Sequence, residues 1–201
     1  MEEIKPLKRS KELAPLSREH HDGLLFAWKV KQGLANGTPI ETLRNYTRWF
    51  WTNHIKPHFK DEEKVLVTFL PADNPLVLQM FKEHAQIRDL IISLDKEPNS
   101  GSLQLLAEFI NNHIRFEERQ LFPYAEQTLT PEQLNEIYKE LPNELQCDTA
   151  WKDEFWVKSK SCRCLVLLNG SCFFSNFYFR KNLLNSLLAF FVFISEIFIH
   201  Q

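Results

Sequence analysis

The feature that most constrains this chain is a motif that occurs twice. His58 begins the first copy, HFKDEEKVL, and His113 begins the second, HIRFEERQL, so that both follow H-Φ-x-x-E-E-x-x-L with Φ apolar. A histidine and a glutamate four residues apart lie on the same face of an α-helix, with Cβ atoms ~6 Å apart. The motif therefore predicts two helices, each presenting an imidazole and a carboxylate that can reach the same metal ion.

Each of these histidine–glutamate pairs lies in an apolar stripe. Glu62 is followed by Leu66 and Phe69, and Glu117 is followed by Leu121. Burying a glutamate on such a face is costly unless the carboxylate is paired or binds a metal. We therefore expect Glu62 and Glu117 to be metal ligands, together with the histidine of each motif.

Three signals that contain proline mark helix starts. Thr38, Asn74 and Thr130 each precede a proline, and Glu41 and Gln133 stand at the capping-box position after the two threonines. The apolar spacing predicts long helices near 16–34, 39–69, 75–96 and 102–128, and a short helix near 131–140. Short connections between long amphipathic helices favour an all-α fold, an antiparallel up-down-up-down four-helix bundle with a short fifth helix. We place this domain at residues 12–146.

The first and third predicted helices each offer a histidine in an apolar setting. His84 precedes Ile87 by three residues, and on the first helix His20 and His21 compete for the same role. Apolar residues follow His21 at spacings of three, four and seven, whereas Gly23 takes the three-spaced position after His20. We select His21 as the ligand and keep His20 as the second candidate, or as a surface residue or a hydrogen-bond donor behind the ligands.

The second predicted helix contains one further histidine and a proline. His54 lies one turn before His58, and Pro57 between them predicts a kink, or a break with a restart at His58. His54 is therefore a second-rank ligand candidate.

The ligand types indicate the metal. Imidazoles with two glutamates and no thiolate suit borderline ions, and carboxylates that can bridge favour two iron ions over zinc. A site with one metal would need fewer ligands than the helices offer.

With its paired motifs, and with Leu121-Phe122-Pro123 after the second, the chain resembles the hemerythrin-like, or HHE cation-binding, domain family over residues 16 to 140. The resemblance implies a four-helix bundle with two irons bridged by two carboxylates. Members bind dioxygen, sense oxygen or iron, or handle nitric oxide and peroxide. The family pattern maps onto this chain as the ligands His21, His58, Glu62, His84, His113 and Glu117.

One position departs from the oxygen-carrying members. They have a second histidine one turn before the ligand on the third helix, where this chain has Met80. His54 is the substitute candidate, and Glu63 and Glu118 are expected to be solvated or to lie behind the ligands. We therefore expect a non-haem di-iron protein that binds or senses dioxygen or a related small oxidant. The alternatives are a di-iron enzyme acting on nitric oxide or peroxide, and a non-catalytic iron- or zinc-binding interaction module.

Composition and charge limit the partners. A formal net charge of −2 gives no basic footprint, so nucleic acid is not expected as a partner. The N-terminal residues contain no apolar stretch of the kind found in signal peptides, which predicts a cytoplasmic protein.

The residues 147–201 form an atypical C-terminal tail. Its last part, from 182 onward, is an apolar run close to the ~20 residues that span a bilayer, but asparagines and Glu196 interrupt it. It can be interpreted as a weak membrane anchor, a partner-binding helix or a frame-shifted or read-through end. We favour the last interpretation.

Overall fold

The computed structural model describes residues 9–142 and 151–158, which belong to one folded unit, Lys8–Ser159. Every regular element in these residues is a helix, so the predicted all-α class is confirmed. None of the described helices combines the length and the apolar character needed to cross a bilayer. Most of the predicted tail, including the apolar run, lies outside the described residues.

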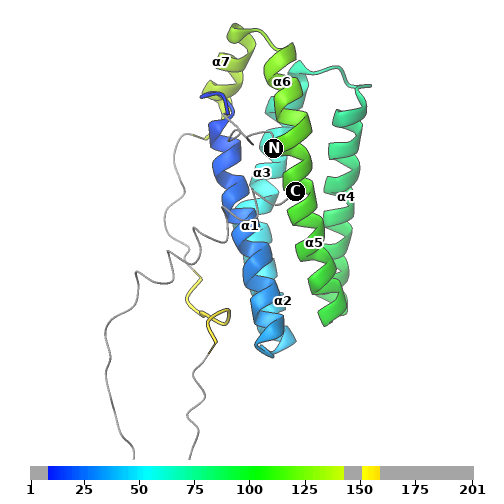
Figure 1. The fold of residues 1–201 in the computed structure, drawn as a ribbon. Coiled ribbons are helices and arrows are strands. Elements are labelled where there is room, and N and C mark those ends of the chain that lie inside the picture. Colours follow the sequence, from blue (N-terminus) through cyan, green and yellow to red (C-terminus); the bar gives the residue numbers. More distant parts are fainter. Residues whose placement is uncertain (1–8, 143–150, 159–201) are drawn as a thin grey trace, which may run out of the picture. The chain divides into compact units, whose positions relative to one another are not determined.

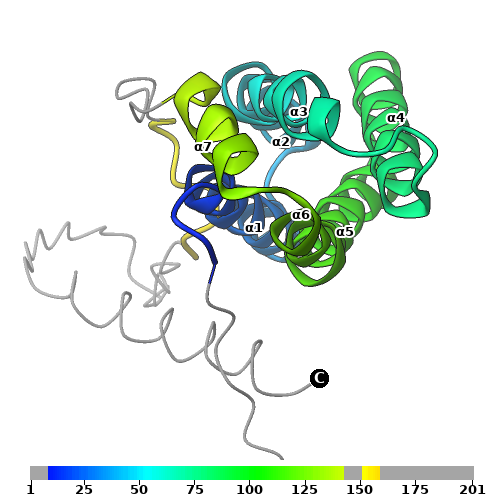
Figure 2. The same cartoon turned by 90° about the horizontal axis from the view of Figure 1, so that it is seen from above.

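The helices agree closely with the ranges predicted from sequence. They are α1 (Ala14–Ala35), α2 (Ile40–Phe50), η1 (Trp51–Ile55), α3 (Lys56–Asp61), η2 (Glu62–Leu66), η3 (Val67–Phe69), α4 (Pro75–Lys96), α5 (Ser100–Phe116), η4 (Glu117–Leu121), α6 (Phe122–Thr128) and α7 (Pro131–Glu140). In Figure 1, α1, α4, the α2–α3 segment and the α5–α6 segment run alongside one another, and the view from above in Figure 2 shows them around a common centre.

Two of the three predicted helix starts have the expected capping bonds. The Asn74 side chain accepts a hydrogen bond from Leu76 N at 2.9 Å, and Thr130 and Gln133 form a reciprocal capping box. Thr38 does not cap α2, whose first residue is Ile40. The Thr38 hydroxyl instead donates to the carbonyl of Phe155 at 3.4 Å, a partner that local sequence could not reveal.

The α-helix restarts beside Pro57, but it does so at Lys56 rather than at His58. The five residues before α3 form a wide π-helical turn, η1, and the α-helix resumes at Lys56 with Pro57 in its first turn. A proline is tolerated there because first-turn amides need no partner within the helix.

Two apolar clusters fill the interior. One contains Phe26, Phe50, Ile91 and Leu103, and the other contains Leu16, Leu66, Met80 and Phe122. On α1, η2 and α4, the buried polar residues between the two clusters are His20, Glu62 and His84. A buried polar layer therefore separates two apolar cores.

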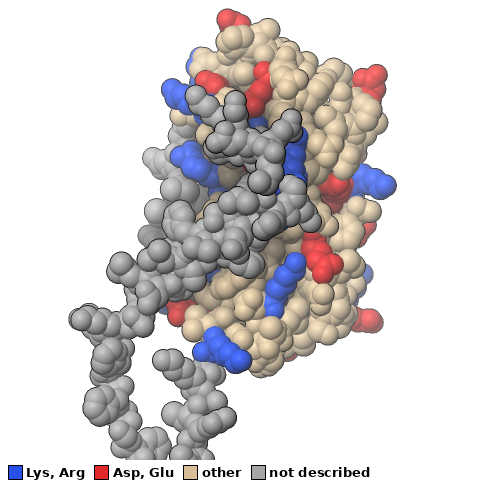
Figure 3. Space-filling model, viewed as in Figure 1, with Lys and Arg blue, Asp and Glu red and all other residues tan. Residues whose placement is uncertain are grey.

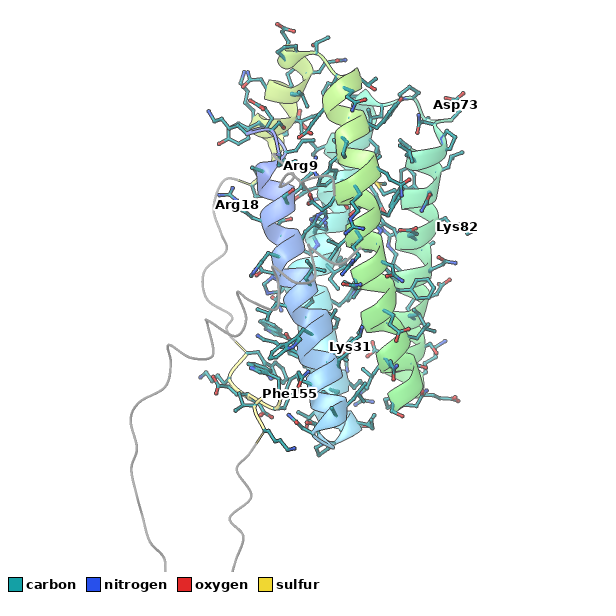
Figure 4. The ribbon with its side chains drawn as sticks, in the orientation of Figure 1. Arg9, Arg18, Lys31, Asp73, Lys82 and Phe155 are labelled. Carbon is teal, nitrogen blue, oxygen red and sulfur yellow. The ribbon has the colours of Figure 1, made fainter. Side chains whose placement is uncertain are left out.

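A short segment of the predicted tail packs on the helices. Phe155, labelled in Figure 4, is 8% exposed and its ring lies 5.0 Å from that of Tyr46. Asn36 donates to the carbonyls of Phe155 and Trp156, and a Cβ at Gly33 would lie only 2.7 Å from the Phe155 ring. Residues of the segment 151–158 therefore pack against α1 and α2.

This packing predicts a stability effect. Phe155→Ala should lower the free energy of unfolding by about 2 kcal/mol, because it removes an almost fully buried ring. Val157→Ala is the matched control, since Val157 is 57% exposed and should change stability by less than ~0.5 kcal/mol. Urea denaturation of the full chain measures both, and equal stabilities would show that the segment does not stabilise the fold.

Candidate metal centre

Six buried side chains form two overlapping groups at the polar layer. Four ligand atoms in each group lie within 4.8 Å of one another. The first group takes His20 from α1 and His58 from α3, and the second takes His84 from α4 and His113 from α5. Both groups share Glu62 and Glu117, the first residues of η2 and η4. The centre thus consists of two groups that could each hold a cation and that share two carboxylates.

The imidazole Nε2 atoms surround the shared carboxylates. In the first group, His20 Nε2 lies 3.1 Å from Glu117 Oε2 and His58 Nε2 lies 3.4 Å from Glu62 Oε1. In the second, His84 Nε2 lies 3.3 Å from Glu62 Oε2 and His113 Nε2 lies 3.2 Å from Glu117 Oε1. Each glutamate therefore turns one oxygen towards each group.

The shared carboxylates are buried without hydrogen-bond donors. Glu62 and Glu117 are 0% exposed, and no described residue hydrogen-bonds any of their four oxygens. The Nε2 atoms of His20 and His58 are equally unsatisfied. Two such anions side by side are unfavourable unless positive charge lies between them and the imidazoles. The donor set therefore fits metal cations.

Each of the four histidines is held from behind by a second carboxylate. The Nδ1–H groups donate at 2.7–2.9 Å. The pairs are His20 with Glu118, His58 with Glu19, His84 with Glu63, and His113 with Glu83. A carboxylate only accepts, so the proton lies on Nδ1 and the lone pair of Nε2 points into the centre. Every imidazole is thus oriented as a metal ligand.

These outer bonds connect neighbouring helices. Within each motif the first glutamate points inward and the second reaches the next helix: Glu63 bonds His84 on α4, and Glu118 bonds His20 on α1. Both motifs enter a π-helical turn at the first glutamate, at η2 and at η4. Such wide turns often occur at functional sites.

Among the four outer carboxylates, Glu118 accepts hydrogen bonds from the largest number of described side chains. Arg9, labelled at the start of the described chain in Figure 4, donates to Glu118 Oε2 at 2.6 Å and to its main-chain carbonyl at 2.7 Å. Ser17 donates to the other carboxylate oxygen at 2.6 Å. Burial alone would raise the pKa of Glu118, but the hydrogen bonds from His20, Ser17 and Arg9 lower it to about 2. Glu118 therefore stays ionised behind His20.

The pKa shifts show a strongly negative potential at the centre. Burial would lower the pKa of His84, yet the adjacent carboxylates of Glu117, Glu62 and Glu63 raise it to about 10. The pKa of His20 is likewise raised well above its ordinary value, because the nearby carboxylates of Glu117, Glu118 and Glu62 outweigh burial. His84 Nε2 also lies 3.1 Å from His113 Nε2. Two lone pairs this close require a shared cation, either a proton or a metal.

The choice of His21 as the inward histidine of α1 is wrong. The side chain of His21 is 56% exposed, whereas that of His20 is 3% exposed and belongs to the first group. The sequence analysis took Gly23 as evidence that His20 does not lie on the inner face. Gly23 does face the interior, because a Cβ there would lie 2.7 Å from Ile114 Cδ1 of α5. The inner face of α1 uses small residues for close packing, so apolar spacing gave the wrong phase.

The structure brings together the other predicted ligands, His58, Glu62, His84, His113 and Glu117, and leaves out His54. The His54 ring is stacked on Phe50 at 4.6 Å, and burial lowers its pKa. Met80, which stands where oxygen-carrying members have a second histidine, is fully buried in the second apolar cluster. Each group therefore contains only two imidazoles.

The sequence interpretation missed Glu19 and Glu83 as the partners of His58 and His113. A signal was present, because a Glu-His pair occurs on both helices, at Glu19-His20 and Glu83-His84. The full repeat is therefore E-H followed by H-x-x-x-E-E, once in each half of the helical unit. This longer repeat would also have selected His20 over His21.

Comparisons with known proteins agree with this site. The family model of the hemerythrin HHE cation-binding domain matches residues 16–125, more than half of the chain. No curated protein and no solved structure gave a match. The matched range contains both motifs and all six side chains of the two groups. The chain belongs to the hemerythrin HHE cation-binding domain family.

Proposed function

We propose that this protein binds two iron ions and uses them to bind or sense dioxygen or a related small oxidant. His20 and His58 hold one ion, His84 and His113 hold the other, and Glu62 and Glu117 bridge both. The helices around them form an antiparallel up-down-up-down bundle. We place the protein in the cytoplasm, with a small molecule rather than a nucleic acid as its partner.

The observation that carries this proposal is the sharing of two unsatisfied, fully buried carboxylates by two pairs of imidazoles. A single ion would neutralise the carboxylates but leave one pair of Nε2 lone pairs without a partner. Two ions use every donor atom. Mixed imidazole and carboxylate ligands suit iron, and carboxylate bridges are typical of di-iron sites in helical bundles.

Aromatic rings and outer carboxylates of the protein hold the imidazoles of the centre in place. The Phe59 ring stacks on His84 at 3.6 Å between centroids, and the Phe122 ring stacks on His20 at 5.2 Å. The outer carboxylates fix the four ring orientations. Bound iron would supply redox and ligand-binding chemistry, and the surrounding side chains would admit only small molecules.

The visible face of the protein agrees with the choice of partner. On the face shown in Figure 3, lysine and arginine side chains alternate with aspartate and glutamate where described residues are visible. A nucleic-acid site would require clustered cations on one face.

Metal analysis tests the proposal directly. Protein purified aerobically after expression in iron-replete medium should contain about two irons per chain and show near-ultraviolet charge-transfer bands that bleach on reduction. Stoichiometric zinc without iron would contradict a di-iron function and favour the metal-binding interaction module.

Adjacent histidines give a matched test of the ligand set. His20→Ala should lower metal affinity at least about tenfold, because it removes an inward Nε2 donor. His21→Ala should leave affinity within about twofold, since that side chain is exposed. Competition titration with a chelator measures both variants, and equal losses would reject the assignment of the α1 ligand.

The outer carboxylates should matter although they touch no metal. Glu83→Ala should weaken metal binding by about ten- to a hundredfold, because His113 loses the partner that orients its ring. Asp89→Asn on the same helix is exposed and serves as the control. If Glu83→Ala binds metal like the control, packing alone orients His113.

A further inference from the structure

A cavity of about 30 Å³ lies beside the His20–His58 side of the centre. His20, His58 and His113 reach its wall, and most of the remaining lining is apolar: Phe50, Ile55, Phe59, Ile110 and Ile114. One water molecule needs ~10–15 Å³ of such space, so the cavity holds a ligand of two or three atoms.

Two further polar side chains line this wall: Glu19, which accepts a hydrogen bond from His58, and His54, which belongs to neither group and binds none of the four histidines. Its ring is stacked on Phe50 and stands edge-on to Trp49 at 5.2 Å, so two aromatic rings fix its orientation. Neither of its ring nitrogens hydrogen-bonds any residue in the described part of the chain. A neutral imidazole carries one N–H donor and one acceptor nitrogen. Apart from Glu19 and the histidines of the two groups, the wall thus contains one further hydrogen-bonding side chain, the fixed ring of His54.

The backbone at this position is also specialised. His54 lies in the π-helical turn η1, and the side chains of Thr52 and Asn53 donate to the carbonyls of Arg48 and Trp49 at 2.9 and 2.7 Å. Thr52 and Asn53 thus donate to main-chain carbonyls four residues earlier, just before the turn. The turn is therefore held by bonds that do not involve His54.

We propose that His54 is a ligand-positioning residue, which donates a hydrogen bond to a diatomic or triatomic molecule held in this cavity. The inference rests on the proposed function, because the other end of that molecule would be bound at the centre. His54 is not a metal ligand in this assignment. It selects small molecules that accept a hydrogen bond over apolar molecules of the same size.

The test uses the full chain loaded with iron, with azide as the probe. His54→Leu should weaken azide binding about three- to tenfold, as expected for the loss of one hydrogen bond, without changing iron content. His54→Gln keeps a side-chain N–H and should recover most of the affinity. His21→Leu is the matched control, since it removes an exposed histidine and should leave azide affinity unchanged.

A second measurement separates the cavity from the metal. Crystals of the chain as purified, pressurised with xenon, should show a xenon atom against Phe50 and Ile110, and Ile110→Phe should remove it. Protein that holds iron but shows no difference in azide affinity between His54→Leu and the control would overturn the inference, and the di-iron proposal would stand. Absence of iron would instead reject the proposed function, while the xenon result would still test the cavity. An iron-loaded chain without the xenon site would also overturn the inference.

Discussion

The centre depends on one electrostatic constraint: two carboxylates are buried next to each other between two apolar cores. Glu62 and Glu117 have no exposed surface, and described residues give their oxygens no hydrogen bond. Like charges in a medium of low dielectric constant repel strongly, so the arrangement persists only with compensating cations. The raised pKa of His84 has the same origin, since protons supply that charge when metal does not. The packing that buries Glu62 and Glu117 therefore also creates the need for the positive charge that a metal or protons can supply.

The four outer carboxylates extend this constraint to the whole unit. Glu19, Glu63, Glu83 and Glu118 each join the histidine of a neighbouring helix, so the bonds run from α1 to α3, α4, α5 and back to α1. Each bond fixes one ring and ties one helix pair together. A shift of any helix would disturb an imidazole of the centre and its outer bond at once, which makes the site sensitive to the packing of the unit.

The sequence predicted those parts of the structure that local rules determine. The helix α4 and the capping box at Thr130 follow from short-range signals, and the His–Glu pairs follow from i,i+4 geometry. The phase of α1 was missed because the approach of α5 at Gly23 sets it, and Thr38 was misassigned because its partner is Phe155. Both errors concern contacts between segments distant in sequence, where periodicity within one helix carries no information.

Close packing of α1 against α5 links the centre to the cavity. Gly23 leaves no side chain between the helices, and the Ile114 side chain occupies the space that a Cβ would need. This approach lets His20 of α1 come within 3.1 Å of Glu117, and Gly23 and Ile114 also line the cavity. A larger residue at position 23 would have to displace Ile114, either into the cavity or away from α1. The same contact between Gly23 and Ile114 therefore sets both the volume of the cavity and the distance between His20 and Glu117. A sequence change at this contact would therefore alter the cavity volume and the geometry of the His20–Glu117 pair together.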